Sequence, residues 1–318
     1  MGFSSRAETP VSVVVPTYGR SDLLGDALRS IEAQTYPDVE LIVVDDHSPI
    51  PVEHLIADMD LSIDEVRCLR HEENRGANAA RNTGIQEASG DVIAFLDDDD
   101  RWDPSYLARV VAAFDDPDIG LVSAGARVID ADGNRIGVHR PSFTPDPMED
   151  LLDGALVGSF SRFAVRASAV DEVGLLDERL PSWQDWEWQF RFARQYRFAA
   201  VSEPLVTHRH GDHEQITDDF EQRRDVSYPV LLERHRKAIA GRSRRDERRF
   251  LGVLARSLAA SALHNGAYLS GICWLLRAVR HDPTGVEAYV YLAAAAGGPI
   301  TYRPLRWLKR SFGGRGAP

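Results

Sequence analysis

The chain contains little cysteine and lysine and no long apolar run. Cys68 and Cys273 are the two cysteines among 318 residues, and they form no CxxC pair. Neither a disulfide framework nor a cysteine zinc site is therefore expected. No run of about 18 apolar residues occurs, and the first ten residues lack the apolar core of a signal peptide. We expect a chain without a membrane span, in a reducing, cytoplasmic setting.

Two phosphate-binding signatures are also missing. No GxGxxG turn follows the first apolar run, and no P-loop occurs anywhere, so neither a dinucleotide-binding fold nor a P-loop enzyme is indicated. Three histidines stand close together in VTHRHGDHEQIT, at positions 208, 210 and 213. No cysteine or second cluster joins them, which argues against a zinc site.

The composition is that of a globular protein, with 43% hydrophobic and 27% charged residues, enough for one large domain or two. The net charge of −12 is unevenly spread. Residues 1–220 hold 19 basic against 42 acidic residues, a net charge of −23, whereas residues 221–318 hold 18 against 7, a net charge of +11. The basic part could face nucleic acid, a membrane surface or the acidic part itself.

Short apolar runs alternate with helical patterns along the first hundred residues. This alternation predicts right-handed crossovers and an α/β fold with a mostly parallel sheet. The expected strands are Val11–Val15, Glu40–Val44, Val66–Leu69 and Val92–Leu96. The expected helices cover residues 23–31, with Ser21 or Asp22 as the cap, then 52–59 and the stretch from Gly76 to Gly90.

Polar residues follow three of these strands, as Thr17, Asp45 with Asp46, and Asp97–Asp100. Ligands of such sheets bind at the carboxyl ends of the strands, so one crevice could hold all three sets. Four adjacent carboxylates repel one another, and oxygen ligands suit Mg²⁺ or Mn²⁺. The acidic run by itself is equally compatible with a solvated turn that opens a helix at Asp103-Pro104. The converging strand ends favour the metal site.

The middle of the chain predicts a hairpin and further strands. The turn Asp130–Asn134 joins two expected strands, 119–124 and 126–138. A strand at 160–165, a helix at 167–173, a strand at 198–201 and a loop at 205–217 complete this part.

A helix with an aromatic face begins near Gln184 and Asp185. A carboxylate at a helix N-terminus beside tryptophans suits a general base, because an apolar wall excludes water and raises its pKa. The alternative is an ordinary N-cap that stabilises the helix by about 1 kcal/mol.

Three motifs together carry a family resemblance. VSVVVPTYGR, ELIVVDDHS and NRGANAARNTGIQEASGDVIAFLDDDDRW, in this order and spacing, resemble the family 2 glycosyltransferases of the GT-A fold over roughly residues 10–215. The resemblance implies an inverting, metal-dependent transferase that uses a sugar nucleotide, UDP- or GDP-linked. It also implies an acceptor hydroxyl on a glycan or a lipid-linked molecule.

The resemblance implies roles for individual residues. The nucleotide would be held by the following residues: Pro16, Thr17, Tyr18, Asp46, Arg81, Asp97 and Asp98. In the DxD-type motif, Asp97 and Asp99 would hold Mn²⁺ or Mg²⁺, with Asp99 as the direct ligand. Asp98 would share that role, and Asp100 would cap the following helix. For Arg81 a plain surface arginine is the alternative.

LPSWQDWEW resembles the Glu-Asp-Trp motif of the same family, with Gln184 in place of the glutamate. The resemblance gives Asp185 the role of the base that deprotonates the acceptor. It also implies that Arg209 and His210 reach the diphosphate, and that His210 reaches the metal.

Three parts are expected along the chain: a flexible N-terminus at 1–9, a GT-A domain at 10–217, and a helical region at 218–318. The last would hold charged helices at 221–249, then alanine- and leucine-rich helices at 250–280 and 286–296. Its basic, aromatic end, TYRPLRWLKRSFGGRG, suits either an anionic membrane surface or a helix packed on its own domain.

Two alternatives to a transferase stay open from the sequence: a sugar-nucleotide-binding pseudoenzyme that acts as an assembly partner, and a nucleotidyltransferase. Nucleic acid is not expected as a partner of the basic tail. PTYGR lacks the glycine-rich, basic loop of a nucleotidyltransferase, and an acidic metal site is not needed to bind nucleic acid.

Overall fold

The computed structural model describes residues 9–155, 157–209, 219–302 and 304. Contacts divide the chain into two compact units. The first comprises Met1–Pro145, Val157–Glu178 and Arg191–Gly211, and the second comprises Asp146–Leu156, Arg179–Phe190 and Asp212–Pro318. Within the described ranges, no helix is both long and apolar enough to span a bilayer.

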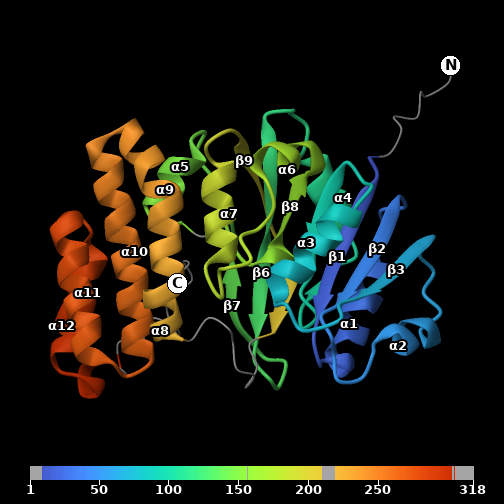
Figure 1. The fold of residues 1–318 in the computed structure, drawn as a ribbon, viewed down its shortest axis with the longest axis horizontal. Helices are drawn as coiled ribbons and strands as arrows, with labels where there is room; N and C mark the ends of the chain where they lie inside the picture. Colours follow the sequence, from blue (N-terminus) through green and yellow to red (C-terminus); the bar gives the residue numbers. More distant parts are fainter. Residues whose placement is uncertain (1–8, 156, 210–218, 303, 305–318) are drawn as a thin grey trace. The chain divides into compact units, whose positions relative to one another are not determined.

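The first unit is built on one mixed sheet, in which the described residues form nine strands (Figure 1). The order is β3-β2-β1-β4-β8-β6-β9-β5, with β7 paired to β6. The strands are β1 Val11–Thr17, β2 Val39–Asp45, β3 Glu65–Arg70, β4 Val92–Phe95, β5 Arg101–Trp102, β6 Ile119–Ile129, β7 Arg135–His139, β8 Phe163–Arg166 and β9 Arg197–Arg209. The strands β3, β2, β1 and β4 are mutually parallel.

Helices cover both faces of this parallel half. Alternate residues of β1 and β2, such as Val13 and Val43, pack with the helices of one face, and Ile42 and Val44 of β2 pack with the other. The first face carries α1 (Ser21–Glu32), α2 (Glu53–Asp58) and α4 (Tyr106–Ala112), and the second carries α3 (Ala77–Glu87). Each fully buried Val or Leu contributes about 1.5–3 kcal/mol. Apolar residues on both faces explain the continuous β-branched runs.

Several strand boundaries differ from those expected, and three of the differences have a clear physical reason. β1 continues through Pro16, because its pairing with β4 ends at Val14 and the missing N–H of proline is not needed there. β6 is one strand that passes through Gly125 with a shift of register. Glycine suits this position, because a Cβ there would lie 2.6 Å from the Glu203 carbonyl oxygen. The expected loop at 205–209 is instead the end of β9, paired with β6 and β5. The helix α6 (Ala167–Val173) lies where the sequence predicts it.

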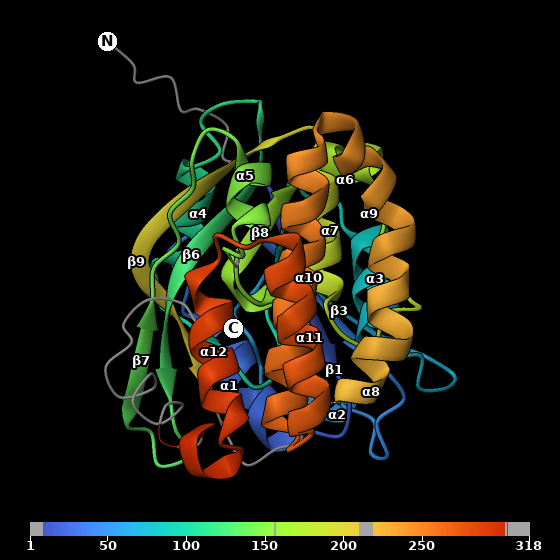
Figure 2. The ribbon, with the colours of Figure 1, turned by 90° about the vertical axis from the view of Figure 1, so that its left-hand side faces the viewer.

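The described part of the second unit is helical. Its elements are α5 Pro147–Leu152, most of α7 Gln184–Phe192, α8 Phe220–Gln222, a π-helical turn Arg223–Ser227, α9 Tyr228–Arg242, α10 Arg244–His264, α11 Tyr268–His281 and α12 Val286–Ala296. Figures 1 and 2 show α10 beside both α9 and α11. The expected helical stretch 250–280 is interrupted, because Gly266, at φ 75°, ends α10. The helix at 286–296 is confirmed as α12.

Candidate active site

The carboxyl ends of β1 and β4 are joined by side chains. The Thr17 hydroxyl donates to Asp98 Oδ2 at 2.8 Å. The Arg20 guanidinium donates through Nη1 to Asp98 Oδ1 at 3.2 Å and to Asp99 Oδ2 at 2.9 Å. The helix α1 begins at Ser21, with Arg20 at the N-cap position instead of the expected Ser21 or Asp22. Arg20 therefore stands between the first strand and the acidic run.

The four aspartates of the run alternate in exposure. The side chains of Asp97 and Asp99 are each 24% exposed, whereas those of Asp98 and Asp100 are 7% and 0% exposed. Two open carboxylates spaced i and i+2 are therefore available to a ligand. The other two are used inside the protein.

Asp100 does not cap the following helix. Its carboxylate accepts from His208 Nδ1 at 3.0 Å and from the Arg209 backbone N–H at 3.2 Å. The helix α4 begins at Tyr106, and Ser105 holds the N-cap position. The prediction of a cap was wrong because β9, remote in sequence, supplies donors that local spacing does not show.

Burial and neighbouring charges shift the pKa values of Asp99 and His208 by a large amount. Burial, followed by the charges of Asp100 and Asp97, raises the pKa of Asp99 to about 7. Burial by itself would lower the pKa of His208, but its hydrogen bond and attraction to Asp100 raise it to about 9. His208 is therefore a cation at neutral pH, and Asp99 loses its proton near neutrality. The cluster holds more negative charge than its protein partners neutralise.

Arg81 lies inside this site and not on the surface. It is 5% exposed, its Nη2 lies 2.5 Å from Asp97 Oδ1, and its guanidinium stacks over the Phe160 ring at 4.0 Å. Among the described residues, neither its Nε nor its Nη1 has a hydrogen-bond partner. Buried donors without partners are costly, which points to an anionic or polar ligand.

The carboxylates of Asp45 and Asp46 accept hydrogen bonds from residues of the loops beside the end of β2. Asp46 accepts from His71 Nδ1 at 2.7 Å and from the backbone N–H groups of Arg75 and Gly76 at 2.9 and 2.7 Å. Asp45 accepts from the Ser48 N–H at 2.7 Å and pairs with Arg70. Asp46 therefore holds the segment that starts α3, the helix that carries Arg81.

The remaining expected residues of the first unit are Pro16, Tyr18, Arg209 and His210. Pro16 is buried within β1, and Tyr18 directly after the strand is 50% exposed. The Arg209 side chain contacts Asp26 Oδ2 at 3.2 Å. His210 lies outside the described residues.

Asp185 belongs to the second unit, in the first turn of α7. Its Oδ1 accepts from the Trp186 backbone N–H at 2.8 Å, and the rings of Trp183 and Trp186 meet edge to face at 5.7 Å. Within the described chain, the side-chain atoms Gln184 Oε1 and Trp186 Nε1 are buried without hydrogen-bond partners. The helix begins where the sequence predicts it.

Sequence reasoning missed Arg20 and His208 as parts of this cluster. Arg20 stands in the PTYGR motif, so a cation four residues after Pro16 was the available signal. His208 was read only as one of three neighbouring histidines. Its pairing with Asp100 depends on β9 returning beside the acidic run, which no local pattern indicates.

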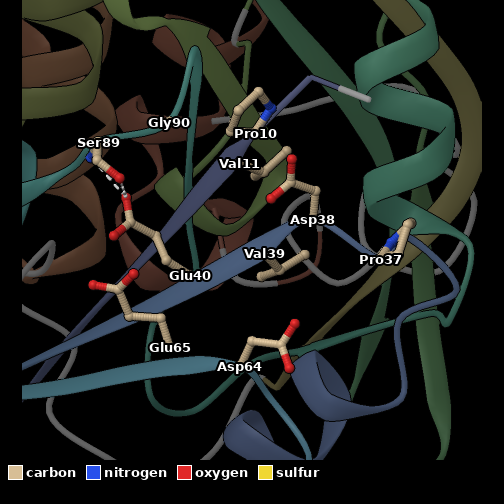
Figure 3. A pocket seen from close by; sticks show the side chains of 10 residues that line it. All are labelled: Pro10, Val11, Pro37, Asp38, Val39, Glu40, Asp64, Glu65, Ser89 and Gly90. Atoms are coloured by element: carbon tan, nitrogen blue, oxygen red, sulfur yellow. Dashed lines mark hydrogen bonds between the residues drawn. The ribbon is translucent and has the colours of Figure 1, made fainter. Parts of the chain in front are cut away.

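A separate cavity of about 140 Å³ lies at the opposite edge of the sheet (Figure 3). Its lining residues lie at the amino ends of β1, β2 and β3. The acidic residues among them are Asp38, Glu40, Asp64 and Glu65. Glu40 is already bonded to Ser12, Ser89 and Arg67. The cavity is too small for a sugar nucleotide and of the wrong charge for a diphosphate.

The carboxylates of Asp97 and Asp99 fit a hard divalent cation that is also held by a bound ligand. Among the described residues, no three His, Cys, Asp or Glu side chains converge as a complete protein cage. Mg²⁺ and Mn²⁺ need only one or two carboxylates when substrate phosphates supply the other oxygens. Asp97 and Asp99 meet that requirement.

Two solved structures share this architecture, the GT-A fold. A fragment of S. aureus TarS matches with a TM-score of 0.55 at 17% identity, covering 89% of this chain and 91% of that chain. The mannosyltransferase PcManGT from Pyrobaculum calidifontis, solved with GDP-Man and Mn²⁺, matches with a TM-score of 0.54 at 18% identity, over 96% and 85% of the two chains. The expected fold class is confirmed.

The chain belongs to glycosyl transferase family 2, whose sequence model matches residues 12–174. It is 32% identical over 198 residues to the uncharacterised glycosyltransferase YwdF of Bacillus subtilis, covering 60% of this chain and 70% of YwdF. It is 30% identical over 183 residues to the glycosyltransferase AglE of Haloferax volcanii, covering 57% of this chain and 60% of AglE. The prediction of an enzyme of the glycosyltransferase class is confirmed.

Proposed function

We propose that this enzyme transfers a sugar, with inversion, from a UDP- or GDP-linked donor to an acceptor hydroxyl. The observation that carries the proposal is the buried Arg81 guanidinium, which contacts Asp97 and leaves two N–H groups without a partner among the described residues, in a cluster where Asp97 and Asp99 are partly exposed. Cation and carboxylates together suit a diphosphate held with a metal. The similar TarS and PcManGT structures contain UDP-GlcNAc and GDP-Man, which supports a nucleotide sugar.

The acidic cluster would bind the leaving side of the donor. Asp99 and Asp97 would hold Mn²⁺ or Mg²⁺, with Asp98 as the neighbour that shares the charge. When bound, the cation neutralises charge that develops on the departing diphosphate. Arg81 would donate to the nucleotide, and Arg209 and His210 would reach the diphosphate. Pro16, Thr17, Tyr18 and Asp46 would form the nucleotide pocket.

Asp185 would act on the attacking side as general base. Its carboxylate takes the proton from the acceptor hydroxyl, whose oxygen then bonds to the anomeric carbon while the bond to the diphosphate breaks. Attack from the face opposite the leaving group produces inversion.

A donor screen tests this proposal. The protein is incubated with Mn²⁺, glycan or lipid-linked acceptors and each nucleotide sugar, and nucleotide release is measured. Release with one donor class, lost on chelation, is expected. Binding without turnover would instead favour the pseudoenzyme, and the absence of any nucleotide-sugar binding in the presence of metal would refute the proposal.

Metal affinity is expected to fall as the pH drops below about 7. Because burial and the charges of Asp100 and Asp97 raise the pKa of Asp99 to about 7, its carboxyl carries a proton at lower pH that the cation must displace. Calorimetric titration with Mn²⁺ alone should show up to about tenfold weaker binding per pH unit below pH 7, and a plateau above it. A constant affinity between about pH 5.5 and 8 would exclude Asp99 as a ligand.

We also propose that the enzyme works at the cytoplasmic membrane face through the basic end of the chain. The second unit exposes large apolar side chains on and after its last helices, with Leu269 and Ile300 more than 80% exposed. Arginines interleaved with aromatic residues favour an anionic lipid surface. Sedimentation with anionic vesicles measures this contact, and neutral vesicles serve as the control.

A further inference from the structure

A buried polar pair joins α7 to α9 within the second unit. His235 Nε2 lies 3.1 Å from Glu187 Oε1, and both side chains are 0% exposed. The His235 ring lies among aromatic rings, 5.3 Å from Phe190 and 6.3 Å from Phe250. Such a pair costs desolvation that an apolar pair would not, so it does not by itself favour folding.

The same region of α7 starts from an unusual backbone. Trp183 has φ 62°, a conformation that costs a bulky residue about 1–3 kcal/mol. The π-helical turn before α9 packs on this segment: the Arg223 guanidinium lies 5.7 Å from the Trp183 ring, and the hydroxyls of Ser182 and Ser227 are 3.1 Å apart. Contacts from the π-helical turn therefore hold the strained residue that precedes α7.

Asp185 lies between the contacts at Trp183 and the buried pair of Glu187 with His235. Trp183 lies two residues before it and Glu187 two residues after it, and the Trp183 carbonyl accepts from the Glu187 N–H at 2.8 Å. One turn of helix thus connects the strained residue, the carboxylate and the buried pair. A shift of this turn would redirect Asp185, and misplacement by about 1 Å can cost a factor of 10² in rate.

We propose that His235 is a positioning residue for transfer: through Glu187 it holds the first turn of α7 in the orientation that Asp185 needs. The inference rests on the proposed role of Asp185 as base. A specificity or positioning role explains why a polar pair is kept where leucine and phenylalanine would pack. On this view α9 belongs functionally to the transferase, although it lies outside the residues that match the family.

The double variant Glu187→Leu with His235→Phe separates positioning from stability. Because both partners become apolar, its unfolding midpoint should stay within about 5 °C of the native value. The Trp186 amide, which donates to Asp185, reports the orientation directly. Its hydrogen exchange should rise about tenfold or more, and kcat should fall about tenfold or more while the KM for donor stays within about twofold.

Two matched variants complete the design. His235→Gln keeps an N–H donor toward Glu187 and should retain most of the Trp186 protection. Ile239→Val, one turn along α9 and 1% exposed, removes one buried methyl group and keeps both members of the pair, so exchange and kcat should stay unchanged. Native protection of the Trp186 amide in the double variant would overturn the inference. Because this readout needs no donor, it is separate from failure of the donor screen, which would overturn the proposed function.

Discussion

Replacing Asp185 with asparagine is expected to lower kcat by about 10²–10⁴-fold with little change in donor binding. Asparagine keeps the shape of the side chain and an oxygen that can accept from the Trp186 N–H, but it cannot take a proton from the acceptor. The loss corresponds to about 3–5 kcal/mol of transition-state stabilisation. Steady-state kinetics with the donor found in the screen measures kcat, and calorimetry measures donor affinity.

Asp171→Asn provides the control for this result. Asp171 is exposed on α6, so the same chemical change there should leave kcat within about twofold. If Asp185→Asn turns over like the native enzyme, another group must be the base. A loss of donor binding equal to the loss in rate would instead mean that Asp185 serves binding and not proton transfer.

Asp99→Asn is expected to abolish metal-dependent turnover, with kcat reduced by about 10³-fold. The substitution removes the charge of an open carboxylate at the proposed cation site, so the charge of the departing diphosphate is no longer balanced. Calorimetric titration with Mn²⁺ in the absence of donor should show at least about tenfold weaker binding. The same titration in the presence of nucleoside diphosphate should show weakened coupling between the two ligands.

Asp103→Asn tests whether the loss of any aspartate in this segment weakens Mn²⁺ binding. Asp103 lies three residues after the run but pairs with Arg127 at 3.3 Å and is partly exposed. Its loss should leave Mn²⁺ affinity within about twofold, because it does not lie in the cluster. Native Mn²⁺ affinity in Asp99→Asn would move the metal ligand to Asp97 or Asp98, and comparison of those two variants then decides the register.

The local sequence pattern predicts strands well where both faces of the sheet are buried. The runs at β1, β2 and β4 are continuous and β-branched because helices cover both faces of that part of the sheet. Their parallel pairing then places Thr17 and the acidic run together, which the structure bears out through the hydrogen bond from Thr17 to Asp98. The same reasoning failed at residues 205–209, because polar residues at the end of a strand resemble a loop until a partner strand is known.

The sequence by itself determined the fold class, the family and the first turn of α7, because these follow from hydrophobic periodicity and from motifs that are local in the chain. Only the tertiary structure decided how each carboxylate of the acidic run is used. Arg20, Arg81 and His208 lie at least 16 residues from the aspartates that they contact, so their pairing depends on strand order and burial. In the folded chain Asp97 and Asp99 stay partly exposed and Asp98 and Asp100 are buried, and burial together with the charges of Asp100 and Asp97 raises the pKa of Asp99 to about 7.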